Sequence, residues 1–184
     1  MKKFLVAFLC LSLLNHFSFG QEGNLPLDSK NEAAYSDVGS LNKSKDLLFQ
    51  NAQKWVVKSF GNYENAVSGE DRPAGKLILK TYAPINSAAY EYLRFTMTIN
   101  CQDGKYQATV SELEGIAKSQ TITALGKRQN DAITQKAVLI KTESNRKKKS
   151  QAENELEEMK SDNERVNDTV YGLLASLKQS MLGE

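Results

Sequence analysis

Hydrophobic and polar residues alternate most regularly along residues 89–114, where the pattern predicts a β-hairpin. Asp103-Gly104 suits its two-residue turn, because such turns need positive φ at both central positions. With Gln102 opposite Lys105, the apolar residues of both strands share one face: Leu93, Phe95, Met97, Ile99, Cys101, Tyr106, Ala108 and Val110. Turn and alternation agree, so we expect an antiparallel sheet with one buried face.

Further β-rich runs predict strands near residues 33–40, 62–69 and 76–83. A helix capped by Asn42 or Ser44 is expected to end near Ser59. Together these segments predict an α+β fold: an antiparallel sheet of about five strands in the order β-α-β-β-β-β-α, with the helices packed on one face.

The first helix carries Trp55, which is the only tryptophan, on its apolar face. We expect this side chain to anchor the helix on the sheet, and ligand stacking by the indole is the alternative. Within 33–114, the predicted core domain, Cys101 belongs to the buried face and is expected to be an inert thiol.

The remainder divides at residue 150. Residues 115–149 show no clear period and are expected to form an irregular connection, with short strands or helical turns at 121–123 and 137–140. Residues 150–184 are expected to be helical. One helix over 150–182 would be about 50 Å long, so we expect a break near Ser161.

The second half of this segment has an apolar stripe with helical spacing, which predicts docking on the sheet: Val166, Val170, Leu173, Leu177 and Met181. The first half, rich in Glu and Asn, is expected to be largely solvated. Just before it stands a basic run, Arg146–Lys149, which we interpret as a solvated approach to the helix. Acidic residues follow at once and no aromatic residue is interleaved, unlike a nucleic-acid patch.

The N-terminus has the pattern of a secretory signal peptide over residues 1–20. The apolar run Phe4–Leu14 follows a positive start and is too short to span a bilayer. Ser18 and Gly20 are small residues at the positions that a signal peptidase reads before Gln21. We therefore expect export to the periplasm, cell envelope or exterior, with no transmembrane segment after cleavage and a flexible leader over residues 21–32.

Cleavage would change the available chemistry. Of 24 basic residues, Lys2 and Lys3 would be lost, leaving 22 against 22 acidic residues and a formal charge of zero. His16, the single histidine, would also be lost. The mature chain would thus lack the histidine of Ser-His-Asp or Cys-His catalysis and of histidine-ligated zinc. We expect no catalytic residues, no metal and no cofactor, with a carboxylate-dependent hydrolase as the alternative.

A candidate binding face consists of Tyr90, Tyr92 and Arg94. Their spacing of two would place them in a row on the face of the sheet opposite the core. Tyrosine and arginine are enriched in interface hot spots. The alternative is ordinary cross-strand packing on a solvated face, because tyrosine is common in strands.

Three segments carry a resemblance to a known family: residues 35–56, the D-x-x-x-G-K of Asp71–Lys76, and residues 93–113. They resemble an uncharacterised family of exported bacterial proteins, domain of unknown function 4468. The resemblance implies a fold similar to the TATA-box-binding protein (TBP) and no particular activity.

We therefore expect an exported, non-enzymatic binding or structural module of the bacterial cell envelope, with an unknown envelope protein or ligand as partner. Nucleic-acid binding by fold analogy is a further alternative. The neutral mature chain and an outer face rich in Thr, Ser and Asn argue against it, and we expect no nucleic-acid partner.

Overall fold

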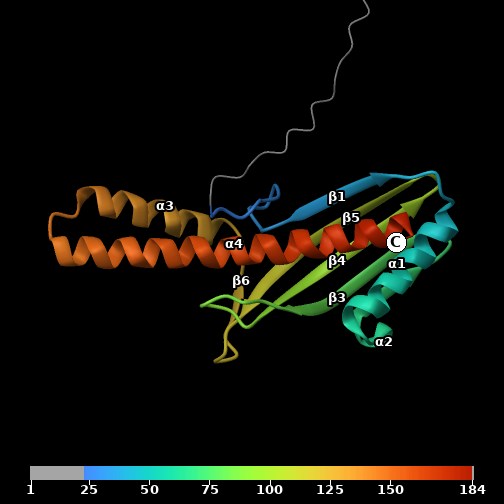
Figure 1. Cartoon of the computed structure of the whole chain (residues 1–184), viewed down its shortest axis with the longest axis horizontal. Coiled ribbons are helices and arrows are strands. Elements are labelled where there is room, and N and C mark those ends of the chain that lie inside the picture. The colour runs from blue at the N-terminus through green and yellow to red at the C-terminus, as the bar shows by residue number, and fades with distance from the viewer. Residues whose placement is uncertain (1–22, 184) are drawn as a thin grey trace, which may run out of the picture.

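The computed structural model describes residues 23–183, so the predicted signal peptide lies outside the described residues. Figure 1 shows a sheet with helices on one face and a pair of helices projecting beyond it. The elements are, in chain order, β1 (Tyr35–Ser40), α1 (Lys45–Phe60), α2 (Tyr63–Ala66), β2 (Val67–Asp71), β3 (Lys76–Pro84), β4 (Tyr92–Gln102), β5 (Lys105–Ile116), β6 (Ile122–Ala124), α3 (Lys127–Thr142) and α4 (Arg146–Leu182).

The sheet is antiparallel throughout, in the order β1-β5-β4-β3-β2, and the short β6 also pairs with β5. The predicted hairpin register is confirmed: Gln102 pairs with Lys105 and Met97 with Val110. The α+β fold class is also confirmed, with six strands rather than five. The register expected from the hairpin pattern therefore holds for the centre of the sheet.

Beyond Ser111 the hairpin register shifts by one residue at a β-bulge. Glu112 occupies the bulge with a φ of 51°, in the left-handed region. The extra residue resets the alternation, so Leu113 is buried although its number has the wrong parity. Without this bulge the charged Glu112 would point into the core.

The core lies between one face of the sheet and the helices α1 and α4. Trp55 is 1% exposed, as predicted, and its indole Nε1 donates a hydrogen bond to Ser176 Oγ of α4 at 3.1 Å. Of the predicted stripe on α4, four residues are buried; Leu174 takes the place of Leu173, which is only partly buried. The two helices thus cover the apolar face together.

The C-terminus of α4 is held by side chains from the α1 region. Lys43 Nζ donates to the carbonyl oxygens of Met181 (2.9 Å) and Leu182 (2.7 Å). A cation suits this end, where the helix dipole is negative and the last carbonyls lack helical partners. This contact fixes the end of α4 over the sheet.

The strand predicted over residues 62–69 is wrong in its first half. Asn62 caps the short helix α2, its side-chain Oδ1 accepting from Asn65 N at 3.0 Å. The strand β2 begins only at Val67 and pairs with β3. The side chain of Asn62 offers a local capping bond that competes with strand pairing.

The irregular connection predicted for residues 115–149 is also wrong. It contains β6, the whole of α3 and the start of α4, and α3 packs antiparallel to the first half of α4 (Figure 1). We call α3 together with residues 146–161 of α4 the arm. The helix α4 runs unbroken through Ser161 for 37 residues, about 55 Å.

The helix continues at the expected break because its flanking residues have partners outside it. Asp162 Oδ1 accepts hydrogen bonds from Ser87 Oγ (2.6 Å) and Ala88 N (2.9 Å), in the loop between β3 and β4. The capping-box residue Ser161 is exposed within the helix.

No helix in the described part of the chain combines the length and apolar character that a bilayer span requires.

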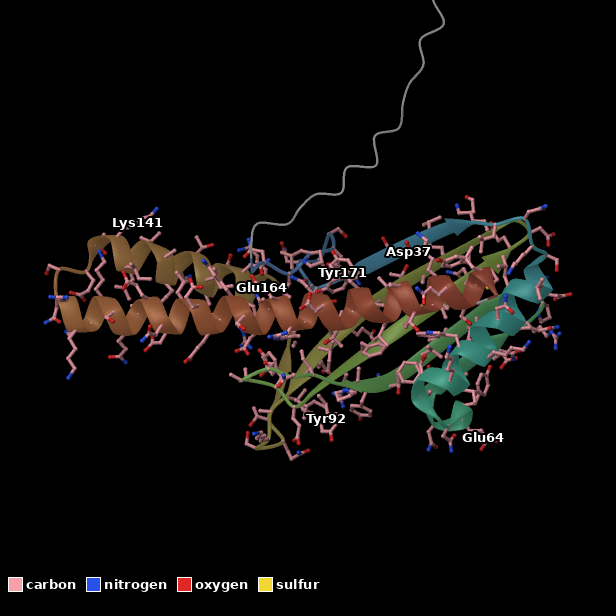
Figure 2. The ribbon with its side chains drawn as sticks, in the orientation of Figure 1. Asp37, Glu64, Tyr92, Lys141, Glu164 and Tyr171 are labelled. Atoms are coloured by element: carbon pink, nitrogen blue, oxygen red, sulfur yellow. The ribbon has the colours of Figure 1, made fainter. Side chains whose placement is uncertain are left out.

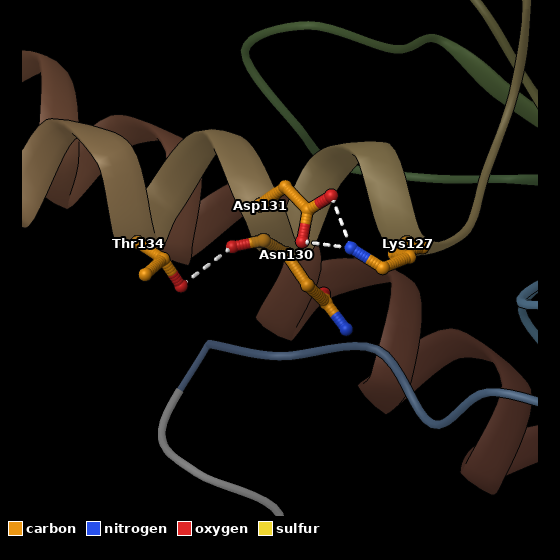
Figure 3. Close-up of polar contacts among 4 residues, drawn as sticks. All are labelled: Lys127, Asn130, Asp131 and Thr134. Carbon is orange, nitrogen blue, oxygen red and sulfur yellow. Dashed lines mark hydrogen bonds and ion pairs between the residues drawn. The ribbon is translucent and has the colours of Figure 1, made fainter.

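The predicted flexible leader is docked from Gly23 onward, as a segment that we call the strap (residues 23–34). Asn130 of α3 donates from Nδ2 to Leu25 O and accepts from Leu25 N, both at 2.9 Å. Asn163 Nδ2 of α4, itself buried, donates to Gly23 O at 2.8 Å. Figure 3 shows the Asn130 side chain turned toward the strap.

Candidate functional site on the open face of the sheet

The structure separates the three residues of the predicted binding face. Tyr92 and Arg94 lie on β4 and point to the face that the helices leave uncovered, whereas Tyr90 lies on the helix side. A Cβ added to Gly115 would come within 2.4 Å of the Tyr90 ring, so ring and glycine are in close contact. The row fails at Tyr90 because β4 begins only at Tyr92, and alternation does not extend into the preceding loop.

The uncovered face of the central strands, which we call the open face, has no buried side chain among its members: Lys76, Ile78, Lys80, Tyr82, Pro84, Tyr92, Arg94, Thr96, Thr98, Asn100, Gln107, Thr109 and Ser111. Its large aromatic residues are Tyr82, 51% exposed, and Tyr92, 41% exposed. Figure 2 shows Tyr92 at the end of the sheet from which the arm projects. The open face thus combines polar side chains with a local pair of aromatic rings.

Tyr82 was missed in the sequence, although it belongs beside Arg94. The two residues are direct cross-strand partners, and Tyr92 faces Pro84 two pairs further along, on the same face of the sheet. The signal was present in the alternation of residues 76–82, which places Tyr82 opposite the apolar residues of β3. The site therefore consists of Tyr82, Tyr92 and Arg94.

Arg94 is held in place by its neighbours on both sides. Its guanidinium forms an ion pair and a hydrogen bond with Glu114 of β5, its cross-strand partner. Hydrogen bonding to Glu114, and then to Tyr82, raises the pKa of Arg94 further above its ordinary value. A fixed, charged and planar donor group is thereby presented at the open face.

A polar hollow of about 420 Å³ adjoins Arg94 at the bulge of β5. It forms where β5 changes its partner strand: β5 pairs with β1 up to Val110 and with β6 from Glu114. Its charged lining has both signs: Lys30, Lys80 and Arg94 with Glu32, Glu112 and Glu114. Such a lining suits a polar ligand that carries both donor and acceptor groups.

Glu112 stands at the centre of this arrangement, in a backbone conformation that glycine adopts more readily. Its carboxylate Oε2 accepts a hydrogen bond from Thr96 Oγ1 at 2.7 Å. A non-glycine residue held at a positive φ lowers stability by about 1–3 kcal/mol, and such residues cluster at functional positions. The positive φ of Glu112 therefore supports including the hollow in the candidate site.

A second pocket, of about 380 Å³, lies on the other side of the sheet where Tyr90 meets the arm. Its lining includes Arg128 of α3 and Met159 and Asp162 of α4. Burial raises the pKa of Tyr90, and the Asp162 carboxylate adds to this effect while Arg128 opposes it. This pocket is a seam between the arm and the sheet.

Cys101 is buried, as predicted, and burial raises the pKa of its thiol to about 11. A thiol with this pKa is protonated near neutral pH and is a poor nucleophile. Within residues 23–183 no group of three or more His, Cys, Asp or Glu side chains is arranged to hold a metal ion.

Comparison with known proteins addresses the fold. Residues 35–114 match the family model of DUF4468, a domain of unknown function with a TBP-like fold. The resemblance drawn from the sequence is thereby confirmed. No curated protein matches the chain significantly.

Two solved structures extend the comparison. A TBP-like protein from Parabacteroides distasonis ATCC 8503 is similar with a TM-score of 0.59 and 16% identity, over 85% of this chain and 96% of that one. A DUF4468 family protein from Bacteroides ovatus ATCC 8483 gives a TM-score of 0.43 and 13% identity, over 54% of this chain and 64% of that one. The first likeness supports the TBP-like fold, and at this identity it bears on the fold alone.

The motif residues of the DUF4468 region have structural tasks in this chain. Asp71 Oδ1 accepts from Ala74 N at 2.9 Å, and Gly75, with a φ of 69°, lies so close to Cys101 that a Cβ would come 2.2 Å from its carbonyl oxygen. Tyr106 donates to Asp37 Oδ2 at 2.7 Å and packs on Gly39. These motif residues therefore specify turns and packing, and none of those just named is a member of the open face.

Proposed function

We propose that this protein is an exported, non-enzymatic binding or structural module of the bacterial cell envelope, and that it binds through the open face. The observation that carries the proposal is the grouping of Tyr82 and Tyr92 with Arg94, which lines the polar hollow, on the face that the helices leave free. Tyrosine and arginine are the residue types that are enriched in interface hot spots. The covered face, by contrast, is occupied by the protein's own core.

The carboxylates of the hollow favour binding over hydrolysis. Glu114 is paired with Arg94, and Glu112 accepts from Thr96. Both carboxylates are thus engaged by side chains of the protein itself, whereas a general acid or base must reach a proton of the substrate. Cys101 is buried, and the chain after Gly20 contains no histidine. We therefore propose a binding role rather than the carboxylate-dependent hydrolase.

The fold gives no reason to propose nucleic-acid binding, since one fold supports many unrelated functions. The open face is polar along β4 and β5, where it carries Thr, Asn, Gln and Ser, and its Arg94 is already paired with an acid. A partner in the envelope, either a protein or a polar ligand, suits this surface better.

Site-specific photo-crosslinking in intact cells tests the binding face. Replacing Tyr92 with p-benzoylphenylalanine is expected to give covalent adducts with a defined partner. Val57, on α1 and 49% exposed, is the matched control and should give few. Equal adducts at both positions, or none at Tyr92, would contradict the proposal.

Export is tested separately by mass spectrometry of the natural protein, which should begin at Gln21.

A further inference from the structure

The tip of the arm concentrates positive charge. We define it as residues 138–150, which contain five basic residues, Lys141 and Arg146–Lys149, and one acid, Glu143, for a net charge of +4. From Gln21 onward the rest of the chain has 17 basic and 21 acidic residues, a net charge of −4. Within the described residues none of the five cations forms an ion pair. Figure 1 places this end of the arm farthest from the sheet.

Lys141 lies in the last turn of α3, where a cation suits the helix dipole, but helix stability does not account for the other four cations. Arg146–Lys149 fill the first turn of α4, and that turn contains no acidic residue. The positive end of the helix dipole lies there, so cations in this turn oppose the helix instead of supporting it. Asn145 provides the cap by accepting from the backbone N–H groups of Lys147 and Lys148. These cations break the rule that cations disfavour the first turn of a helix, and no structural contact compensates for them. Such exceptions are expected at functional positions.

Apolar side chains accompany the charge. Val138 is 56% exposed and Leu139 is 48% exposed, both in the last turns of α3 beside Lys141. Figure 2 shows Lys141 near the end of α3, on the side away from α4. Cations next to exposed aliphatic residues are typical of helices that lie on anionic membranes. A single-stranded nucleic-acid site would stack bases on aromatic rings, and residues 138–150 contain none.

We propose that the arm tip binds the surface of an anionic phospholipid bilayer. Lys141 and Arg146–Lys149 face the phosphate headgroups, and Val138 and Leu139 reach the boundary with the acyl chains. The 16 residues of α3 span about 24 Å, so the arm holds the sheet away from the membrane and leaves the open face free. This membrane contact is separate from the partner site at Tyr92 and goes beyond it.

Vesicle co-sedimentation of the chain from Gln21 tests the proposal. This chain contains all described residues and lacks Phe4–Leu14, which would bind any vesicle. The probes are phosphatidylcholine vesicles with and without about 30% phosphatidylglycerol, at about 50 mM and about 500 mM salt. The test variant is Lys147→Glu with Lys148→Glu, and acids in the first turn favour the helix. The control, Lys54→Glu with Lys118→Glu, makes the same charge change at exposed positions away from the arm.

The expected result is binding to anionic vesicles that high salt removes, with neutral vesicles left unbound. The tip variant should lose at least about tenfold in partitioning, and the control should stay within about twofold. The pair Val138→Ser and Leu139→Ser should also weaken binding while the charge stays unchanged. Equal losses in tip and control variants would overturn the proposal. So would tighter binding to duplex DNA than to the vesicles, with no effect of the serine pair.

Discussion

The two halves of α4 belong to one unbroken helix and have different surroundings. Residues 146–161, in the arm, bury Ala152 alone, whereas residues 162–182 bury Asn163, Val166, Val170, Leu174, Leu177 and Met181. The second half closes the core over the sheet, and the first half has α3 as its main neighbour. Folding stability therefore resides in the docked half, and the arm is free to present its surface. The following predictions test this contrast.

The largest effect is expected at the joint between α1 and the docked half. Trp55→Ala should lower the free energy of unfolding by about 3–5 kcal/mol, because it removes a buried indole that also bonds to Ser176. Val57→Ala, at an exposed position of the same helix, should change it by less than about 0.5 kcal/mol. Denaturant titration measures both. A loss below about 1 kcal/mol for Trp55→Ala would mean that the core is not organised around this contact.

A matched pair of leucines on α4 compares the two halves directly. Leu177→Ala should cost about 2–5 kcal/mol, because the side chain is fully buried against the sheet. Leu156→Ala, half-buried in the arm, should cost less than about 1 kcal/mol. Denaturant titration of both variants measures the two losses in the free energy of unfolding. Equal costs would show that the arm contributes to the core as much as the docked half does.

The sequence predicted the parts of the fold that are specified locally. The hairpin register follows from Asp103-Gly104 and from alternation, and burial of Trp55 follows from helical spacing. The arm could not be predicted in this way. Within α3 only Ile133 is buried, and the apolar face of this helix is short, continuing only through the partly buried Ala137 and Ile140. The continuity of α4 through Ser161 depends on tertiary partners of Asp162 that the local sequence does not contain.

The contact between the strap and α4, at the border between the two halves, is expected to contribute less to the free energy of unfolding than Trp55 or Leu177 does. Asn163→Ala should cost about 1–3 kcal/mol, because it leaves the carbonyl of Gly23 without its donor and removes a buried amide. It should also speed proteolysis near Gly23. Asn154→Ala, exposed in the arm, is the control and should change little. An unaltered cleavage rate would mean that the strap is held by its apolar residues instead.

The candidate site was predicted in part, for a physical reason. Tyr92 and Arg94 were found because alternation holds along β4, and Tyr90 was misplaced because the strand starts after it. The hollow was missed because it depends on the bulge at Glu112. A bulge shifts the strand's alternation by one residue, and the sequence carries no glycine at that position to signal it.

The smallest effect is expected at the bulge. Glu112→Gly should leave stability unchanged or raise it by up to about 1 kcal/mol, because relief of the positive φ offsets the lost Thr96 bond. Ser111→Gly, at the preceding strand position, should destabilise by about 0.5–1 kcal/mol. Thermal unfolding of both variants measures the difference. A clear loss at Glu112 would show that its side chain, and not the backbone, stabilises the bulge.

Hydrogen exchange along α4 tests most directly the claim that one helix combines a stabilising half with a free half. In the chain from Gln21, amides of residues 166–181 should exchange near the rate of global unfolding, because the sheet must open to release them. Amides of residues 146–158 should exchange far faster through local opening of the arm. Protection of the same strength from Arg146 to Met181 would contradict the account, since it would make the arm part of the folding core.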